Sequence, residues 1–271
     1  MEKDPAYPQA YAGVGEAYAL LTHFRSVPPH EGIPKAKAAA QKALELDANL
    51  AEGHCAMGAG DYMAWQWQAA EEEARRCVEL NPNLSIAHAY HSYVLASLGR
   101  LDESIAENKR ALELDPVSFN NNYYVADNYY YARDYDRAIE QLLKMIRIEP
   151  NQPLLHSTLA DSYAMKGELD KAASEYEKAL ALDGGDDQAE DLRRAYAKGG
   201  FRGLLQAQIQ FWNDPKKPGG YCPDWVAENY SRLGARESAF FWLDRAYEDN
   251  DKTTCEGNLV DIKVHPYYDN I

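Results

Sequence analysis

The sequence lacks an excess of positive charge. Its 271 residues hold 28 Lys and Arg against 43 Asp and Glu, which gives a formal net charge of −15. Because nucleic-acid affinity depends largely on cations that neutralise phosphates, we expect no direct binding of DNA or RNA and no attraction to an anionic membrane surface. The acidic excess favours a partner of basic character, with surface solubility as the alternative explanation.

Segments that enter a membrane are also lacking. No apolar stretch approaches the ~18 residues that a membrane-spanning helix needs, so we expect no membrane insertion. The N-terminal residues contain no apolar signal core, and nothing in them directs export. We therefore expect a cytoplasmic protein by default. The alternative is an extracytoplasmic domain excised from a longer, membrane-anchored protein.

Cysteine is scarce, and its spacing excludes common sites. The four cysteines, Cys55, Cys77, Cys222 and Cys255, form no C-x-x-C pair, which removes the commonest zinc and redox signatures. We predict free buried thiols at all four positions. The alternative is a disulfide between Cys222 and Cys255, which lie near the two ends of one predicted hairpin.

Catalytic and cofactor motifs are lacking as well. His88 and His91 are one helical turn apart, and His54, His88 and His156 share one repeat phase, but no H-E-x-x-H accompanies them. We interpret these histidines as structural and predict no metal site. Gly13–Gly15 follows no strand, which excludes a phosphate loop, and no G-x-S-x-G occurs. We expect a protein that is not an enzyme and has no cofactor.

What the sequence does contain is a 34-residue period. A period of this length indicates a stack of helical hairpins. The residues that recur in phase are Pro82, Pro116, Pro150 and Gly184; Ala70, Ser104, Ala138 and Ala172; Cys77, Ala111, Met145 and Ala179; Leu80, Leu114, Ile148 and Leu182; and Gly58, Ser92, Ala126 and Ala160.

The recurring residues have a physical explanation. Small side chains allow two antiparallel helices to approach closely, and proline ends a helix because it lacks an N–H and clashes with the preceding turn. Asp102, Asp136 and Asp170 follow the turn inside each copy, where a carboxylate can cap a helix N-terminus. The pattern therefore predicts an all-α fold whose repeated positions serve packing.

The period divides the chain into about seven hairpins. Four regular copies cover residues 51–84, 85–118, 119–152 and 153–186. The first hairpin, about 5–48, contains a proline-rich insertion over residues 27–34 that we predict to be an extended loop. Residues 187–213 form a degenerate pair around two glycines, residues 220–253 form the last pair, and residues 254–271 form a cap. We predict one domain over residues 1–271.

These residues resemble the tetratricopeptide repeat (TPR) family. The fourth copy is most similar, with Leu159, Ala160, Tyr163, Gly167, Ala172, Tyr176 and Ala179, although Gly184 replaces proline. Asp61 and Leu95 depart from the family's aromatic position. The resemblance implies a right-handed α-solenoid with a C-terminal capping segment. Lys35–Glu52 and Ala64–Trp67 resemble, more narrowly, repeat modules attached to bacterial winged-helix regulators, signalling kinases or cyclases.

The resemblance also implies where a ligand binds, because first helices line a concave face that holds peptides or partner helices in this family. A known subset uses Lys, Arg and Asn there to grip a carboxylate. This sequence has Glu52, Cys55 and Ala59 at the corresponding positions of the first regular copy, so the clamp is absent.

Aromatic and acidic side chains occupy the concave face in place of the carboxylate clamp. Tyrosine combines a rigid apolar ring with a hydroxyl group, and a nearby carboxylate pairs with Arg or Lys. We therefore predict a protein scaffold that binds a basic or aromatic peptide. The alternative is a sensor module of a larger signalling protein that binds a small ligand. The candidate ligand-binding residues are Tyr90, Tyr93, Asn120, Tyr123, Asp127, Tyr130 and Asp161.

Overall fold

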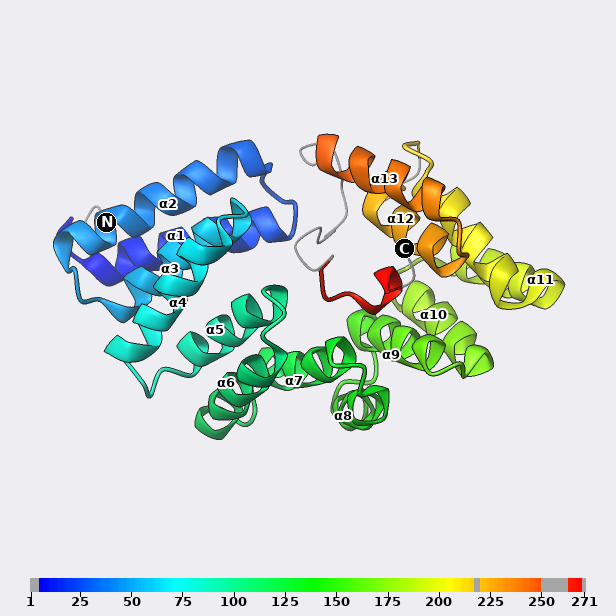
Figure 1. Ribbon diagram of the computed structural model, residues 1–271, viewed down its shortest axis with the longest axis horizontal. Coiled ribbons are helices and arrows are strands. Elements are labelled where there is room, and N and C mark those ends of the chain that lie inside the picture. The colour runs from blue at the N-terminus through cyan, green and yellow to red at the C-terminus, as the bar shows by residue number, and fades with distance from the viewer. Residues whose placement is uncertain (1–4, 217–219, 250–262, 270–271) are drawn as a thin grey trace. The chain divides into compact units, whose positions relative to one another are not determined.

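The computed structural model describes residues 5–216, 220–249 and 263–269. Within these ranges the fold is all-α, with thirteen α-helices and one short 3-10 helix (Figure 1). The helices are α1 (Pro8–His23), α2 (Pro29–Leu46), α3 (Ala51–Met63), α4 (Trp67–Leu80), α5 (Ser85–Ser97), α6 (Leu101–Leu114), α7 (Phe119–Tyr131), α8 (Tyr135–Ile148), α9 (Pro153–Met165), α10 (Leu169–Leu182), α11 (Asp186–Trp212), α12 (Pro223–Arg232), α13 (Arg236–Glu248) and η2 (Pro266–Tyr268).

The helices pack as sequential hairpins, as the period predicted. Consecutive helices contact each other in the pairs α1–α2, α3–α4, α5–α6, α9–α10 and α12–α13. The chain forms two compact units. Unit 1 holds residues 1–121 and 249–256, and unit 2 holds residues 122–248 and 257–271. The candidate site described below lies within unit 2.

The small residues of the repeat are buried, which confirms their role in helix packing. Ala70, Ser104, Ala138 and Ala172 have no exposed surface. A side chain at Gly58 would be tightly packed, because an added Cβ would lie 3.1 Å from the Tyr90 ring and 3.2 Å from the Ala70 carbonyl. Burial is less uniform at the apolar position that ends each second helix, since Ile148 is 81% exposed.

The proline-rich segment is helical, so the prediction of an extended loop was wrong. Pro28 is the extended residue before α2, and Pro29 occupies the first turn, where the missing N–H has no intrahelical partner to lose. Pro34 lies inside the helix. Gly32 lets α2 approach α1, because an added Cβ would come within 1.9 Å of the Thr22 hydroxyl.

The turns inside the hairpins contain one residue with positive φ each. These residues are Arg25, Trp65, Gly99, Arg133, Gly167 and Gly234, with φ between 54° and 82°. Only glycine adopts this conformation without strain, so Arg133 is held in a costly backbone state.

The helix caps differ from the prediction. Asp134 caps α8 by accepting from the Arg137 amide, while Asp136 lies in the first turn instead of at the cap.

The prediction of free cysteine thiols was wrong. Cys55 of α3 and Cys77 of α4 form a disulfide, with their Cα atoms 5.4 Å apart. The close helix approach that small residues permit brings the two Cβ atoms within bonding range. Cys222 is also disulfide-bonded, and Cys255 lies outside the described residues.

Three histidines at one repeat phase join the helices of their hairpins. In each, Nδ1 lies 2.6 Å from a glutamate on the second helix, and Nε2 lies 2.9–3.1 Å from a carbonyl before the first helix. The sets are His54 with Glu73 and Ala48, His88 with Glu107 and Pro82, and His156 with Glu175 and Pro150. These contacts fit the structural interpretation of the shared phase.

Asn108 of α6 is expected to destabilise the fold. It is 1% exposed, and neither amide atom has a hydrogen-bond partner within the part of the chain that is described. The same phase carries Leu142 in the next copy, which has no exposed surface. Replacing Asn108→Leu should therefore raise the free energy of unfolding by about 1 kcal/mol in urea denaturation. A lower stability would show that the site cannot accept the apolar side chain.

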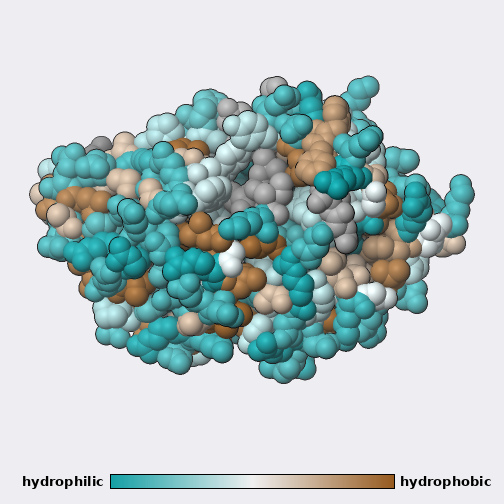
Figure 2. Space-filling model, in the orientation of Figure 1, coloured by the Kyte–Doolittle hydropathy of each residue, from teal (hydrophilic) through white to brown (hydrophobic). Residues whose placement is uncertain are grey.

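Figure 2 shows that the face in view is mostly hydrophilic, with apolar residues scattered over it. Among the described residues, no helix combines the length and apolar character needed to span a bilayer.

Candidate functional site

The candidate site is built around the end of the chain. Residues 263–269, here called the C-terminal segment, lie against α12 of unit 2, where Figure 1 shows them in red. Val264, Pro266 and Tyr267 of this segment are buried. The Ser231 hydroxyl of α12 donates to the Tyr267 carbonyl. The segment is thus a stretch of polypeptide docked on the helices of its own unit.

The Tyr267 hydroxyl is recognised by a carboxylate. It donates to Asp161 Oδ1 of α9, and the hydroxyl of Tyr176 on α10 donates to the same oxygen. The two hydroxyl oxygens lie 3.3 Å apart. Burial raises the pKa of Asp161, whereas the Arg232 charge and the two hydroxyl donors oppose that shift. Asp161 therefore acts as a half-buried acceptor for two phenol groups.

Arg232 of α12 supplies the positive charge of the site. Its guanidinium lies 4.3 Å from the Tyr267 ring centre, 5.1 Å from that of Phe201 and 5.6 Å from that of Tyr176. Its Nη2 atom is buried without a hydrogen-bond partner among the described residues. A cation enclosed by aromatic rings in this way attracts their π-faces. We call Tyr130, Asp161, Tyr176, Ser231 and Arg232 the Tyr267 site.

His265 packs between aromatic rings at the edge of the site. Its ring centre lies 5.7 Å from that of Tyr130, 6.0 Å from that of Tyr131 and 4.7 Å from that of Tyr267. Burial is the main cause that lowers its pKa, and Arg232 and Arg133 add to it, bringing the pKa to about 3. The docked imidazole is therefore neutral.

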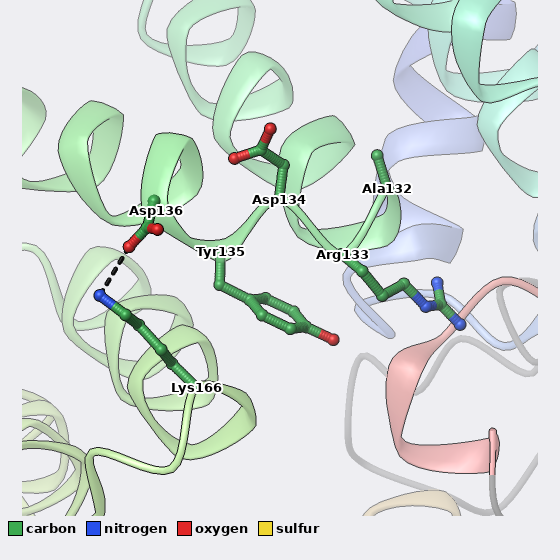
Figure 3. Close-up of a pocket in the computed structure, with 6 residues that line it drawn as sticks. All are labelled: Ala132, Arg133, Asp134, Tyr135, Asp136 and Lys166. Atoms are coloured by element: carbon green, nitrogen blue, oxygen red, sulfur yellow. Dashed lines mark ion pairs between the residues drawn. The ribbon is translucent and has the colours of Figure 1, made fainter.

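Arg133 holds the other end of the segment. Its Nη1 donates to the Val264 carbonyl at 2.6 Å, and its Nε donates to Asp269 Oδ2 at 3.0 Å while Nη2 donates to Oδ1. This two-point contact is the geometry in which arginine selects a carboxylate. The strained turn between α7 and α8 thus presents its side chain to the C-terminal segment, as Figure 3 shows.

A shallow pocket lies on the other side of the same turn. Its volume is about 290 Å³, and its lining residues are Ala132, Arg133, Asp134, Tyr135, Asp136 and Lys166. Lys166 Nζ pairs with Asp136 at 2.6 Å, which is the dashed contact in Figure 3. The lining is polar and carries both signs of charge.

Four of the sequence-predicted site residues belong to unit 2. Tyr130 and Asp161 contact the C-terminal segment directly. Tyr123 bonds to Thr158 Oγ1 at 3.1 Å, and burial, followed by Asp127 and Asp161, raises its pKa well above 10. Tyr123 and Asp127 lie on α7 with Tyr130, and a binding role for them stays a prediction.

The other three predicted residues belong to unit 1. Tyr90 packs over Gly58, and its hydroxyl oxygen is buried without a hydrogen-bond partner within the described ranges. The Tyr93 ring lies 5.0 Å from that of Tyr62. Asn120 is exposed. A binding role for these three stays a prediction that is separate from the Tyr267 site.

Sequence reasoning did not find Arg133, Tyr176, Ser231 or Arg232. Tyr176 was named only among the residues that resemble the family, and it is 7% exposed. Arg133 carried a signal, since arginine stands where the neighbouring copies have Gly99 and Gly167. No signal in the sequence indicated that Arg232 meets the end of the chain.

Protonation of His265 is expected to weaken docking of the C-terminal segment. The docked pKa of about 3 lies below the ordinary value of 6.5. A neutral imidazole thus stabilises docking fully above pH 6.5, and this contribution is lost as the pH falls through the range between the two values. The amide protection factors of the segment should fall by up to about tenfold per pH unit in this range.

The His265→Gln variant is the control for this pH effect. Glu228 also faces His265, with Oε1 4.0 Å from Nε2, and Asp161 carries a raised pKa nearby. These carboxyl groups remain in the variant, so any pH slope that persists belongs to them. Hydrogen exchange measured at several pH values should give a smaller slope for His265→Gln than for wild type, and equal slopes would exclude His265 as the source.

The fold and its docked polypeptide define a class, an all-α protein of sequential helical hairpins. Residues 153–186 match the tetratricopeptide repeat family model. These residues form a tetratricopeptide repeat, and the chain is similar in fold to TPR proteins, which generally serve as protein interaction modules.

The chain is similar in sequence to parts of longer proteins. One is the small glutamine-rich tetratricopeptide repeat-containing protein 2 of Mycosarcoma maydis, 28% identical over 46% of this chain and 33% of the relative. Another is a DnaJ homolog subfamily C member 3 homolog of Dictyostelium discoideum, 28% identical over 49% of this chain and 27% of the relative. The chain thus spans a third or less of these relatives.

Solved structures share the fold. PilF of Pseudomonas aeruginosa has a TM-score of 0.56 and 17% identity over 97% of this chain and 98% of its own. YrrB, described as a TPR protein with an unusual peptide-binding site, has a TM-score of 0.50 and 18% identity over 71% of this chain and 95% of its own. At such identities the likeness concerns the fold.

Proposed function

We propose that the protein is a non-catalytic scaffold that binds a peptide or a partner segment at the Tyr267 site and along Tyr123 and Asp127. One observation carries this proposal: a stretch of polypeptide, the C-terminal segment, already contacts Tyr130 and Asp161. These two residues are among those that sequence reasoning assigned to a peptide. This contact supports a site that can hold a polypeptide chain.

The chemistry of the site suits a peptide in three ways. Ser231 bonds to a backbone carbonyl, which any peptide offers. Asp161 accepts from a side-chain hydroxyl, and Arg232 faces an aromatic ring. Backbone contacts provide affinity in such sites, and side-chain contacts provide specificity. The peptide-binding site described for YrrB supports the same role by analogy.

Peptide panning tests this proposal. Because Tyr267 occupies the site, panning should use the full chain carrying Tyr267→Ala, which removes the docked ring. Peptides that are enriched should bind about tenfold more weakly when Asp161→Asn is added, because a charged acceptor is lost. The matched control is Asp170→Asn, since Asp170 also accepts from a tyrosine hydroxyl, that of Tyr196, at an exposed position. Enriched peptides insensitive to Asp161→Asn would contradict the proposal.

A second candidate function is the sensing of a small ligand. The pocket of about 290 Å³ beside Arg133 favours it, because Lys166 and Arg133 offer cations and Tyr135 offers a ring. A thermal-shift screen with amino acids, sugars and organic acids would test this function. A stabilising compound whose effect disappears in Lys166→Ala would support it, and the absence of any stabilising compound would leave the scaffold as the function.

A further inference from the structure

The C-terminal segment shows which groups the Tyr267 site recognises. The Tyr267 site and the neighbouring Arg133 together make four specific contacts, each from a different side chain. Asp161 takes the tyrosine hydroxyl, Ser231 takes the tyrosine carbonyl, Arg232 faces the tyrosine ring, and Arg133 takes a carboxylate two residues later. The hydroxyl and ring of Tyr267 and the carboxylate of Asp269, at a fixed spacing along the segment, are therefore the groups that the site and Arg133 recognise.

The charges of the site select an acidic ligand at one end. Arg133 donates to both oxygens of the Asp269 carboxylate and to the Val264 carbonyl. A lysine or arginine at the place of Asp269 would put two cations in contact, which repels the ligand. This conclusion differs from the basic ligand that the acidic composition alone suggested, because the arginines come from the α7–α8 turn and from α12.

The same segment blocks the site to other peptides. Val264 and Tyr267 are 5% and 4% exposed, so an external peptide cannot reach Asp161 and Arg232 while they are docked. A segment tied to the same chain competes at an effective concentration on the order of millimolar. The apparent affinity for an external ligand is then reduced by the fraction of molecules whose site is open.

From these contacts we infer that the C-terminal segment is a tethered competitor of the Tyr267 site, and that the external ligand is a peptide with a tyrosine followed two residues later by Asp or Glu. The inference rests on the proposed function and names its ligand class. It also gives residues 263–269 a regulatory role: a ligand binds by displacing the docked tyrosine.

The test uses a fluorescent peptide with the sequence of residues 263–269, capped at both ends to remove terminal charges. Its affinity is measured by anisotropy for the full chain in three forms: wild type, Tyr267→Ala, and Tyr267→Ala with Asp161→Asn. The Tyr267→Ala form should bind at least about tenfold more tightly than wild type, because the tethered competitor is removed. Adding Asp161→Asn should reverse most of this gain.

Two controls show that the gain comes from the docked segment. Tyr247→Ala removes an exposed tyrosine of α13 that is 65% exposed, and it should bind the peptide as wild type does. Asp269→Asn changes only the exposed contact with Arg133 and leaves the buried ring in place. It should also increase peptide affinity, so the inference remains testable if Tyr267→Ala impairs folding, as judged by circular dichroism.

Variants of the peptide test the ligand class. Replacing Tyr267→Phe in the peptide removes the hydroxyl donor and should weaken binding by about tenfold. Replacing Asp269→Lys in the peptide should abolish detectable binding. Equal affinities of all three peptides would overturn the ligand class.

The outcomes separate this inference from the proposed function. A wild-type affinity equal to that of both folded Tyr267→Ala and Asp269→Asn would overturn the tethered competitor. Panning on Tyr267→Ala that enriches peptides without the tyrosine and acid pattern would overturn the ligand class and leave the scaffold function standing. Panning that enriches nothing would overturn both. A dimer that disappears in Tyr267→Ala would show that the segment docks on a second copy and would overturn the tether.

Discussion

Arg232→Met is expected to lower the free energy of unfolding by about 3 kcal/mol, because it removes a cation from three aromatic rings and from the neighbourhood of the half-buried Asp161 carboxylate. The guanidinium lies 4.3–5.6 Å from the ring centres of Tyr267, Phe201 and Tyr176. Its charge also opposes the rise that burial causes in the pKa of Asp161. Methionine keeps most of the side-chain volume, so the loss reports mainly on charge. Urea denaturation measures it.

A matched arginine provides the control for Arg232→Met. Arg236 lies 5.6 Å from the Phe240 ring centre and is exposed, so Arg236→Met should change stability by less than about 0.5 kcal/mol. Adding Asp161→Asn to Arg232→Met should recover part of the loss, because the carboxylate then no longer lacks its neighbouring cation. Equal losses for Arg232→Met and Arg236→Met would show that the buried site contributes nothing to stability.

Removal of the Cys55–Cys77 disulfide is the second change with a large expected effect. The bond joins residues 22 positions apart on α3 and α4. Closing a loop of this length stabilises the fold by roughly 3 kcal/mol, chiefly by restricting the unfolded chain. The double substitution Cys55→Ala with Cys77→Ala should cost about this amount in urea denaturation. Alanine suits the packing, since Ala111 holds the same phase in the next copy with no exposed surface.

Adding reductant distinguishes the contribution of the disulfide bond to stability from the contribution of side-chain packing. Reduced wild type should lose most of its advantage and approach the stability of the double variant. The double variant should have the same stability with and without reductant, apart from any effect at Cys222. If thiol labelling shows that reductant has opened the Cys55–Cys77 bond and the stability of wild type is nevertheless unchanged, a structural role for this disulfide would be contradicted.

The fold was predictable from the sequence because the period reflects local geometry. Two helices can approach closely only where side chains are small, so Ala70 and Ala138 mark the same contact in each copy and both are fully buried. The proline-rich start of α2 was not predictable from proline content alone. Its first proline occupies a helix turn that needs no N–H, which depends on where the helix begins.

The candidate site was predictable only in part, because its parts are distant in sequence. Asp161 and Tyr130 stood out as polar or aromatic residues on first helices. Their contact with Tyr267 joins residues 106 positions apart in the case of Asp161, and no period relates the end of the chain to α9. The cysteine pairing was missed for a similar reason: Cys77 occupies a small-residue position, which concealed that Cys55 faces it.

The central claim is that the Tyr267 site holds a polypeptide that a ligand can replace. Hydrogen exchange of the segment's amides in the wild-type chain, measured with and without an excess of the peptide of residues 263–269, tests this claim most directly. Isotope labelling of the protein alone distinguishes its own segment from the added peptide. The account predicts protected amides in the free chain and faster exchange once the peptide is present. Unprotected amides in the free chain, or protection that the peptide does not change at saturation, would contradict it.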